Sequence, residues 1–478
     1  MSQVSAARRR GAKPAAEATR LTREQRMNRG RAARTEVPRS SHAGFAPGPQ
    51  RPDPLTLLER QATMRVPELL PIRYGRMALS AFTFFRGAAL PMACDLAGTP
   101  RTGIVVQACG DAHLANFGVF ASPERRLIFD INDFDETLPG PWEWDVKRLA
   151  ASLEVAGRDN DFSTRDRRNI VIGAVAAYRQ AMREFAAKPA LEVWYAHADM
   201  AEVRARLEPR LARGGRKTLA RTLAKARTKD NLGALDRFAG NPDGKPGIVA
   251  EPPLIVPLRD LVRDAAQAED RLRGMFSSYR SSLEPERRAL FDQYELVDLA
   301  RKVVGVGSVG TRAYMALLLG VDENDPLFLQ AKEAGPSVLE EFVGPSEYDN
   351  CGQRVVVGQR LMQTVSDIFL GWVRVQGFDG QTRDFYLRQL RDWKGSAEIE
   401  SMVPAGMRAY GELCGWTLAR AHARSGDGIA IAAYLGSSSA FDVAIQEFAG
   451  AYADQTERDH RVLVEAIESG RVTADAGV

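Results

Sequence analysis

The chain of 478 residues is long enough for about two to four domains or lobes, and its 45% hydrophobic and 26% charged residues are typical of a globular protein. It contains no run of eighteen apolar residues and no apolar segment near its start, so we expect neither a transmembrane helix nor a secretory signal. The four cysteines show no C-x-x-C spacing, which disfavours a disulfide framework or a zinc site and favours a cytoplasmic location.

The charge is distributed unevenly along the chain. Residues 1–51 carry 12 Lys and Arg against 3 Asp and Glu, whereas the remaining residues carry 53 against 58. Residues 1–55 are rich in Arg, Ala, Pro and Gly and show little apolar periodicity, a pattern typical of disorder. We therefore expect a disordered, solubilising basic tail over residues 1–55. The alternative is weak, salt-dependent binding of this tail to nucleic acid.

The body of the chain divides by its hydrophobic periodicity. Residues 56–100 and most of 145–295 have helical patterns, with a basic stretch at 201–230 that we interpret as a solvated helix face. Short apolar runs predict strands at Gly103–Cys109, Leu127–Ile131, Lys302–Val306, Arg312–Leu319, Leu327–Lys332, Ile368–Val375 and Phe385–Leu390. Helices are predicted over 353–365, 404–424 and 440–469.

The strongest chemical signal lies between residues 110 and 136. Asp111 and Asn116 occupy a loop between two apolar strands, and the next strand runs into a second acidic cluster that comprises Asp130, Asp133, Asp135 and Glu136. Such a hairpin can place one carboxylate near an attacking hydroxyl while an amide and another carboxylate hold Mg²⁺, the combination that phosphoryl transfer needs. The alternative is that these residues only form turns and caps. Two acidic ends on one hairpin favour a bound cation.

The loop has a recognisable order of residues. Gly110-Asp111-x-His113-x-x-Asn116, followed by Asp133-Phe134-Asp135, resembles the catalytic loop and metal-binding aspartate of protein-kinase-like phosphotransferases, most closely the aminoglycoside and choline kinase branch. Cys109 stands where that branch has histidine. The resemblance implies that Asp111 is the base and that Asn116 and Asp133 hold Mg²⁺.

Two further residues acquire expected roles from this resemblance. The kinase branch has a buried structural aspartate about twelve residues after its metal-binding aspartate, and Asp145 stands twelve residues after Asp133. Asp145 is thus expected to anchor the catalytic loop through backbone N–H groups. His113 is expected to orient Asp111 or the metal, with a purely packed loop histidine as the alternative.

The body as a whole resembles the bacterial family called domain of unknown function 2252, which is assigned to the kinase-like superfamily and has no established substrate. The segments that carry this resemblance are Phe82–Gly87, Cys109–Phe120, Trp142–Leu149, Val303–Arg312 and Arg388–Gly395.

The resemblance also implies a lysine that reaches the nucleotide phosphates from a β-rich lobe, which normally precedes the catalytic loop. No lysine occurs between Lys13 and Lys147. Downstream, Val303–Arg312 reads as a strand, a glycine-rich turn and a second strand, and Lys332 ends the next strand, as in the Val-Ala-Ile-Lys pattern of kinases. We therefore predict a circularly permuted order, in which Lys332 and the turn residues bind the phosphates; these turn residues are Gly305, Gly307, Ser308 and Gly310.

The glutamate that kinases pair with this lysine is not evident, because the predicted helix 353–365 contains none. Glu340, Glu341 and Glu347 are the candidates, and an absent pair is the alternative. The glycines also fit the dinucleotide-binding fingerprint G-x-G-x-x-G, which needs a helix directly after them.

Together these patterns predict an α+β, two-lobed, kinase-like fold. Its parts would be the catalytic-loop and helical part at 56–300, the nucleotide-binding β-rich lobe at 301–396 and the completing helices at 397–478. The expected function is transfer of the ATP γ-phosphate, with Mg²⁺, to a hydroxyl of an unidentified small-molecule or protein acceptor. The alternatives are an ATP-binding pseudokinase, a nucleotidyltransferase and, from the glycine fingerprint, a dinucleotide-dependent oxidoreductase.

Overall fold

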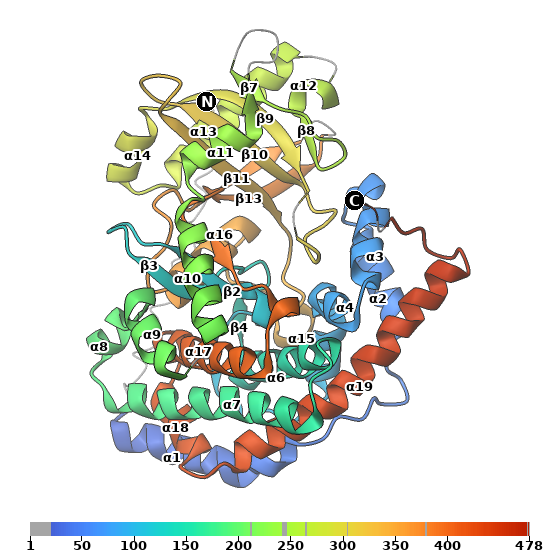
Figure 1. The fold of residues 1–478 in the computed structure, drawn as a ribbon, viewed down its shortest axis with the longest axis vertical. Coiled ribbons are helices and arrows are strands. Elements are labelled where there is room, and N and C mark those ends of the chain that lie inside the picture. The colour runs from blue at the N-terminus through green and yellow to red at the C-terminus, as the bar shows by residue number, and fades with distance from the viewer. Residues whose placement is uncertain are drawn as a thin grey trace, which may run out of the picture.

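The computed structural model describes residues 21–477 except 211–212, 241–245, 263–264, 304, 378–379 and 476. The fold is α+β, as predicted, with a β-rich part above a larger helical part (Figure 1). Between them lies a pair of small sheets that carries the acidic loops.

The helical part is built around two long helices, α7 and α17, which run side by side in the same direction and approach closely at Gly415. A Cβ at this glycine would collide with the carbonyl of Ala174 on α7. The bounds of the main helices are α1 (Arg23–Glu36), α6 (Trp142–Asp159), α7 (Thr164–Ala187), α17 (Pro404–Ser425), α18 (Gly428–Leu435) and α19 (Ala440–Glu468). The flanking helices are α2 (Pro54–Ala62), α3 (Leu70–Ala78), α4 (Ala81–Gly87), α5 (Ala89–Ala97), α8 (Ala190–Tyr195), α9 (Met200–Leu207) and α10 (Arg213–Arg227).

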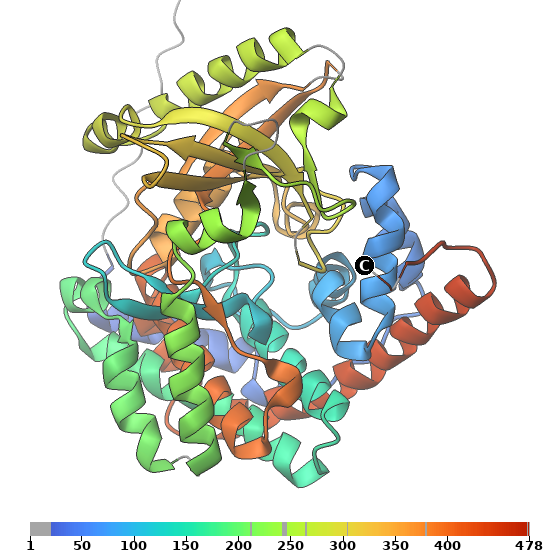
Figure 2. The same ribbon diagram turned by 45° about the horizontal axis from the view of Figure 1, so that its top comes forward.

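The β-rich part is an antiparallel sheet in the order β12-β13-β11-β10-β9-β8. Its strands are β8 (Ile255–Pro257), β9 (Glu295–Lys302), β10 (Ala313–Leu319), β11 (Pro326–Ala334), β12 (Gly371–Gln376) and β13 (Thr382–Gln389). Residues on β10 alternate between two cores, because successive side chains of a strand point to opposite faces. Ala316 and Leu318 pack with α13 (Ala265–Ser281) and α14 (Pro285–Phe291), whereas Met315 and Leu317 pack with α11 (Asn231–Phe238) (Figure 2).

The small sheets position the acidic loops beneath this sheet. β1 (Val105–Ala108) pairs with β4 (Leu138–Pro141), and a four-stranded sheet has the order β14-β2-β3-β5. The hairpin strands are β2 (Phe117–Ala121) and β3 (Leu127–Ile131), and the edges are β5 (Ala198–Asp199) and β14 (Gly395–Ser396). β14 follows closely after β13, so the chain that leaves the upper sheet pairs directly with β2 of the β2–β3 hairpin. The remaining elements are β6 (Ala239–Gly240), β7 (Gly247–Ile248), α12 (Leu258–Leu261), α15 (Glu340–Val343) and α16 (Cys351–Met362).

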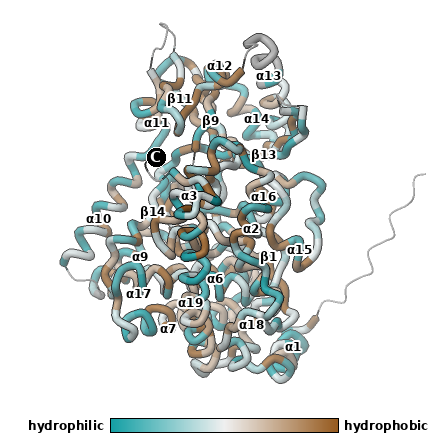
Figure 3. Tube along the Cα trace, turned by 90° about the vertical axis from the view of Figure 1, so that its right-hand side faces the viewer, coloured by the Kyte–Doolittle hydropathy of each residue, from teal (hydrophilic) through white to brown (hydrophobic). Residues whose placement is uncertain are grey.

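The prediction of a disordered tail over 1–55 is wrong for the described part of that segment. A capping box between Thr22 and Gln25 begins α1, and Gly30 lies so close to α18 that a Cβ there would collide with the carbonyl of Ala430. Arg34 donates to the carbonyl of Tyr434 at 2.8 Å. The helix is largely hydrophilic (Figure 3) and docks through small residues and arginines, so no apolar periodicity marks it in the sequence. Residues 1–20 lie outside the described residues.

The predicted start of the β-rich lobe at residue 301 is also wrong. The sheet begins at β8 and includes β9, which ends at Lys302 where a strand over Lys302–Val306 was expected. The valines that follow β9 do not extend the strand. Val309 is buried with Val66, which ties the glycine-rich turn to the segment between α2 and α3.

No single described helix is long and apolar enough to cross a membrane. Only α18 and α19 taken together meet the length and composition criterion, and they are bent by 88° relative to each other.

Candidate active site

The loop after β1 is held by the buried carboxylate of Asp145, which lies in the first turn of α6. The backbone N–H of Cys109 donates to Asp145 Oδ2 at 2.6 Å, and that of Gly110 donates to Oδ1 at 2.9 Å. His422 Nε2 lies 3.1 Å from the same carboxylate. These are the backbone contacts expected of an anchoring aspartate. Gly110 adopts φ 80°, a conformation that favours glycine, and turns the chain toward Asp111.

Asp111 projects from this loop, with its side chain 20% exposed. Arg148 on α6 donates to Asp111 Oδ1 at 2.8 Å through Nε, and its Nη2 lies 2.5 Å from the same oxygen. Asn116 Nδ2 donates to the backbone carbonyl of Asp111 at 2.7 Å. His113 Nε2 lies 3.7 Å from Asp111 Oδ2. Asp111 is therefore fixed by one oxygen while the second faces His113.

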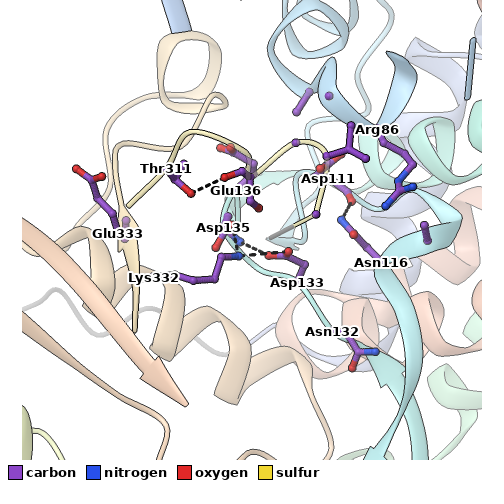
Figure 4. A pocket seen from close by; sticks show the side chains of 18 of the residues that line it. Arg86, Asp111, Asn116, Asn132, Asp133, Asp135, Glu136, Thr311, Lys332 and Glu333 are labelled. Atoms are coloured by element: carbon purple, nitrogen blue, oxygen red, sulfur yellow. Dashed lines mark hydrogen bonds and ion pairs between the residues drawn. The ribbon is translucent and has the colours of Figure 1, made fainter. Parts of the chain in front are cut away.

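The second acidic segment meets Lys332 of β11. Lys332 Nζ lies 2.6 Å from Asp135 Oδ2 and 3.4 Å from Asp133 Oδ2, and its side chain is 3% exposed (Figure 4). Tyr386 on the neighbouring strand donates its hydroxyl to Asp135 Oδ1 at 2.6 Å. The structure thus brings together two predicted site residues that are 199 positions apart in the chain.

The charges of this cluster support one another. Burial by itself would raise the pKa of Asp133, but Lys332, Arg388 and Lys394 outweigh it and lower this pKa to about 2. Burial also disfavours the ammonium of Lys332, yet Asp133 and Asp135 raise its pKa above the ordinary value. Asp133 and Lys332 are therefore both ionised at neutral pH.

None of the three glutamates considered as partners of Lys332 has a hydrogen bond or ion pair with it in the described structure. Glu340 accepts from the backbone N–H of Ser337, and Glu341 pairs with Arg60. Lys332 instead forms its shorter ion pair with Asp135. The helix α16, which follows β11, contacts the same loop through Arg354, which donates to the carbonyls of Asp135, Thr137 and Gly335 at 2.6–2.9 Å.

The glycine-rich turn lies between two antiparallel strands, β9 and β10. A dinucleotide fingerprint instead requires a strand followed by a helix, so this geometry does not fit it. Gly305 and Gly310 have φ of 67° and 89°. A Cβ at Gly307 would lie 2.9 Å from the carbonyl of Arg86, so this glycine permits close packing of the turn on α4.

These segments surround one cavity of about 450 Å³. Of the predicted site residues, those that line it are Asp111, His113, Asn116, Asp133, Gly305, Gly307, Ser308 and Lys332. Gly310 and Asp145 do not line the cavity. The site prediction did not include Gln330, Arg388 and Lys394, which also line the cavity. Gln330 is two residues from Lys332 on β11, so strand alternation alone was a usable signal for it.

The donor chemistry fits Mg²⁺ bound together with a nucleotide. Among the residues that the structure describes, no group of three or more His, Cys, Asp or Glu side chains could hold a metal ion by itself. Mg²⁺ is commonly held by one or two carboxylates plus substrate phosphates, so such a cage is not required. Asp133 supplies a carboxylate that is 29% exposed, and Asn116 supplies an amide oxygen, since its nitrogen is occupied by Asp111.

Glu136 provides a test of the electrostatics of this cavity. Burial raises its pKa to about 7, with Asp111 and Asp135 adding to the shift, while the N–H of Val338 opposes it. The folded state therefore holds the extra proton between pH 4.5 and 7, and stability falls as pH rises through this window.

Glu136→Gln stays neutral, so we expect it to exceed the wild type in stability by roughly 2 kcal/mol at about pH 8 and to show no gain at about pH 4. Urea unfolding at both pH values measures this, with the exposed Glu286→Gln as control. An equal gain at both would contradict the assignment.

Comparison with known proteins defines the chain at the family level. Residues 65–466 match a family model described as an uncharacterized protein conserved in bacteria, DUF2252, so the chain belongs to that family, as predicted. The matched range includes every residue that lines the cavity except Gln61. The curated proteins give no match, and the solved structures give none.

Proposed function

We propose that the protein is a Mg²⁺- and ATP-dependent phosphotransferase with a circularly permuted, protein-kinase-like fold, which transfers the γ-phosphate to a hydroxyl of an acceptor. The observation that carries the proposal is the contact of Lys332 with Asp133 and Asp135 in the cavity that Asp111 also lines. Kinase catalysis depends on this set of groups, namely a base, metal-binding oxygens and a phosphate-binding lysine.

The order of elements in the upper sheet supports the kinase interpretation. In protein kinases a glycine-rich loop covers the phosphates and the lysine lies on the third strand. Here β9, the glycine-rich turn and β10 are followed by β11, which carries Lys332, and then by the short helix α15, the helix α16, and the strands β12 and β13. In the sheet these strands are neighbours in the order β9-β10-β11-β13-β12. In this proposal these elements correspond to the nucleotide lobe of a kinase, placed after the catalytic loop in the chain instead of before it.

Each residue of the site has a role in this proposal. Asp111 accepts the proton of the acceptor hydroxyl, and Arg148 keeps its carboxylate pointed into the cavity. Asn116 and Asp133 hold Mg²⁺, while Lys332 and the backbone of the glycine-rich turn contact the phosphates. Bound Mg²⁺ and ATP supply charge neutralisation and the phosphoryl group.

Adenylyl transfer is a second candidate, because basic side chains, Arg388 and Lys394, also line the part of the cavity next to β13 and β14. Lys394 has no hydrogen bond or ion pair with any described residue, and Arg388 Nε is buried without a partner there. Phosphates of a nucleotide bound in the opposite direction would be attracted to these cations.

The products of Mg-ATP turnover separate the two candidates. Phosphoryl transfer releases ADP and adds about 80 Da to the acceptor, whereas adenylyl transfer releases diphosphate and adds about 329 Da. We expect ADP, formed slowly with water as acceptor and faster with the true acceptor. Diphosphate would support the second candidate, and Mg-ATP that remains intact with every hydroxyl compound offered would indicate a protein that binds without transfer.

A further inference from the structure

Arg86, near the end of α4, is a cavity cation without a protein partner. It lines the cavity, and among the described residues none forms a hydrogen bond or an ion pair with its guanidinium. Its Nε is buried and unpartnered within the described structure, and its guanidinium carbon lies 6.0 Å from the centroid of the Phe82 ring, which is a weak contact. Arg148, by contrast, is fully engaged by Asp111 and by the carbonyl of Phe85.

A second unpartnered atom lies in the same corner. His113 is 4% exposed, and its Nδ1 has no hydrogen bond within the described chain. Of the charges that act on Arg86, that of Glu400 is the largest and that of Asp111 follows, and Arg86 in turn contributes to the electrostatic environment of His113, so Arg86, Asp111 and His113 lie near one another. Figure 4 shows Arg86 on the side of the cavity that holds Asp111 and Asn116, away from Lys332. Most buried polar atoms have a hydrogen-bond partner in the protein, an ordered water or a bound ion, so two unpartnered atoms in one corner of a cavity are candidates for ligand contacts.

The glycine-rich turn packs against this corner of the cavity. The glycine-rich turn packs directly on the backbone of Arg86 through Gly307, and Arg76 donates to the carbonyl of Gly305 at 2.7 Å. Arg65 donates to the carbonyl of Val309 at 2.6 Å. The turn is thus fixed against α4 beside Arg86, and the partial burial of the guanidinium strengthens its attraction for an anion.

We infer that Arg86 and His113 form an anion subsite beside Asp111, which takes a phosphate-type group by charge-assisted hydrogen bonds. Two sources share this chemistry: an anionic substituent on the acceptor, and the γ-phosphate of the nucleotide. The assignment of either source rests on the proposed function, whereas the subsite itself does not. An acceptor source would define the substrate class as a hydroxyl compound that already carries a phosphate.

The subsite is tested by calorimetric titration of the full chain with inorganic phosphate in the absence of nucleotide. We expect Arg86→Gln to weaken phosphate binding by about tenfold or more, since an arginine–phosphate pair is a strong, bidentate contact. Arg86→Lys should retain part of the binding. The matched control is Arg60→Gln, which removes an exposed arginine that pairs with Glu341 and does not line the cavity, and which should change phosphate binding little. Absence of phosphate binding to the wild type, or equal binding to Arg86→Gln, would overturn the inference.

Titrations in the presence of nucleotide distinguish the two sources. If the subsite receives the acceptor, phosphate binds both with Mg-ADP and with a non-hydrolysable Mg-ATP analogue. If it receives the γ-phosphate, phosphate binds with Mg-ADP but is excluded by the analogue. Exclusion by both would place the phosphate elsewhere and overturn the inference. A protein that binds phosphate through Arg86 but ignores Mg-ATP would retain the subsite and refute the proposed function.

Discussion

Asp145→Ala is expected to lower the free energy of unfolding by about 3–5 kcal/mol, the range found when one member of a buried charged network is removed. The carboxylate is 1% exposed and accepts from the backbone N–H groups of Cys109 and Gly110, besides contacting His422. These donors would be left buried without an acceptor, and water cannot easily replace it. Urea unfolding followed by circular dichroism measures the change.

A control is available at an equivalent helix position. Asp166 lies in the first turn of α7, as Asp145 does in α6, so both interact similarly with the helix dipole. The side chain of Asp166 contacts only Ser163 in the described structure, and Asp166→Ala should cost about 1 kcal/mol or less. A loss of stability for Asp145→Ala no larger than this control would contradict the anchoring role.

Asp111→Asn is expected to reduce turnover of Mg-ATP by about 10²–10⁴-fold, because the amide cannot accept the proton of the attacking hydroxyl. The variant keeps an oxygen for Arg148, so the loop should keep its shape. Binding of Mg-ATP should persist, since the proposed metal ligands Asn116 and Asp133 are unchanged. The rate of ADP release, compared with the nucleotide-induced rise in unfolding temperature, separates the two effects.

The matched control for this variant is Glu333→Gln. Glu333 also lines the cavity, but its carboxylate is paired with Arg312 and Arg383 on the upper sheet. Its loss should leave turnover within a few-fold of the wild type. Equal rates for Asp111→Asn and the wild type would remove Asp111 from the reaction.

Local patterns were sufficient to predict much of the fold. Alternating or continuous apolar runs marked β3 at Leu127–Ile131 as observed, and placed α17 and α19 within one or two residues of their ends. The order of motifs predicted that Lys332 and Asp133 belong to one nucleotide site, but it did not predict the ion pair between them. Nothing in the spacing of residues so far apart in the chain specifies such a contact.

Other features depend on tertiary contacts that no local pattern encodes. α1 is stabilised by the close approach of Gly30 to α18 and by arginine side chains that donate hydrogen bonds to backbone carbonyls of α18. Its sequence pattern alone is therefore that of a polar tail. Asp135 was not expected as the partner of Lys332, because the resemblance directed attention to a glutamate on the following helix. The role of Lys394 in the cavity depends on how β14 pairs with β2, a register that the sequence does not reveal.

The central claim, that this cavity binds Mg-ATP through its acidic loop and its lysine, is tested most directly by thermal unfolding. The wild type, Asp133→Asn and Lys332→Met would each be heated alone, with Mg-ATP and with NAD. At about 100 times its dissociation constant, Mg-ATP should stabilise the wild type by about 2.7 kcal/mol, and this gain should be lost in both variants. Stabilisation by NAD without any effect of Mg-ATP, or an equal effect of Mg-ATP on all three proteins, would contradict the account.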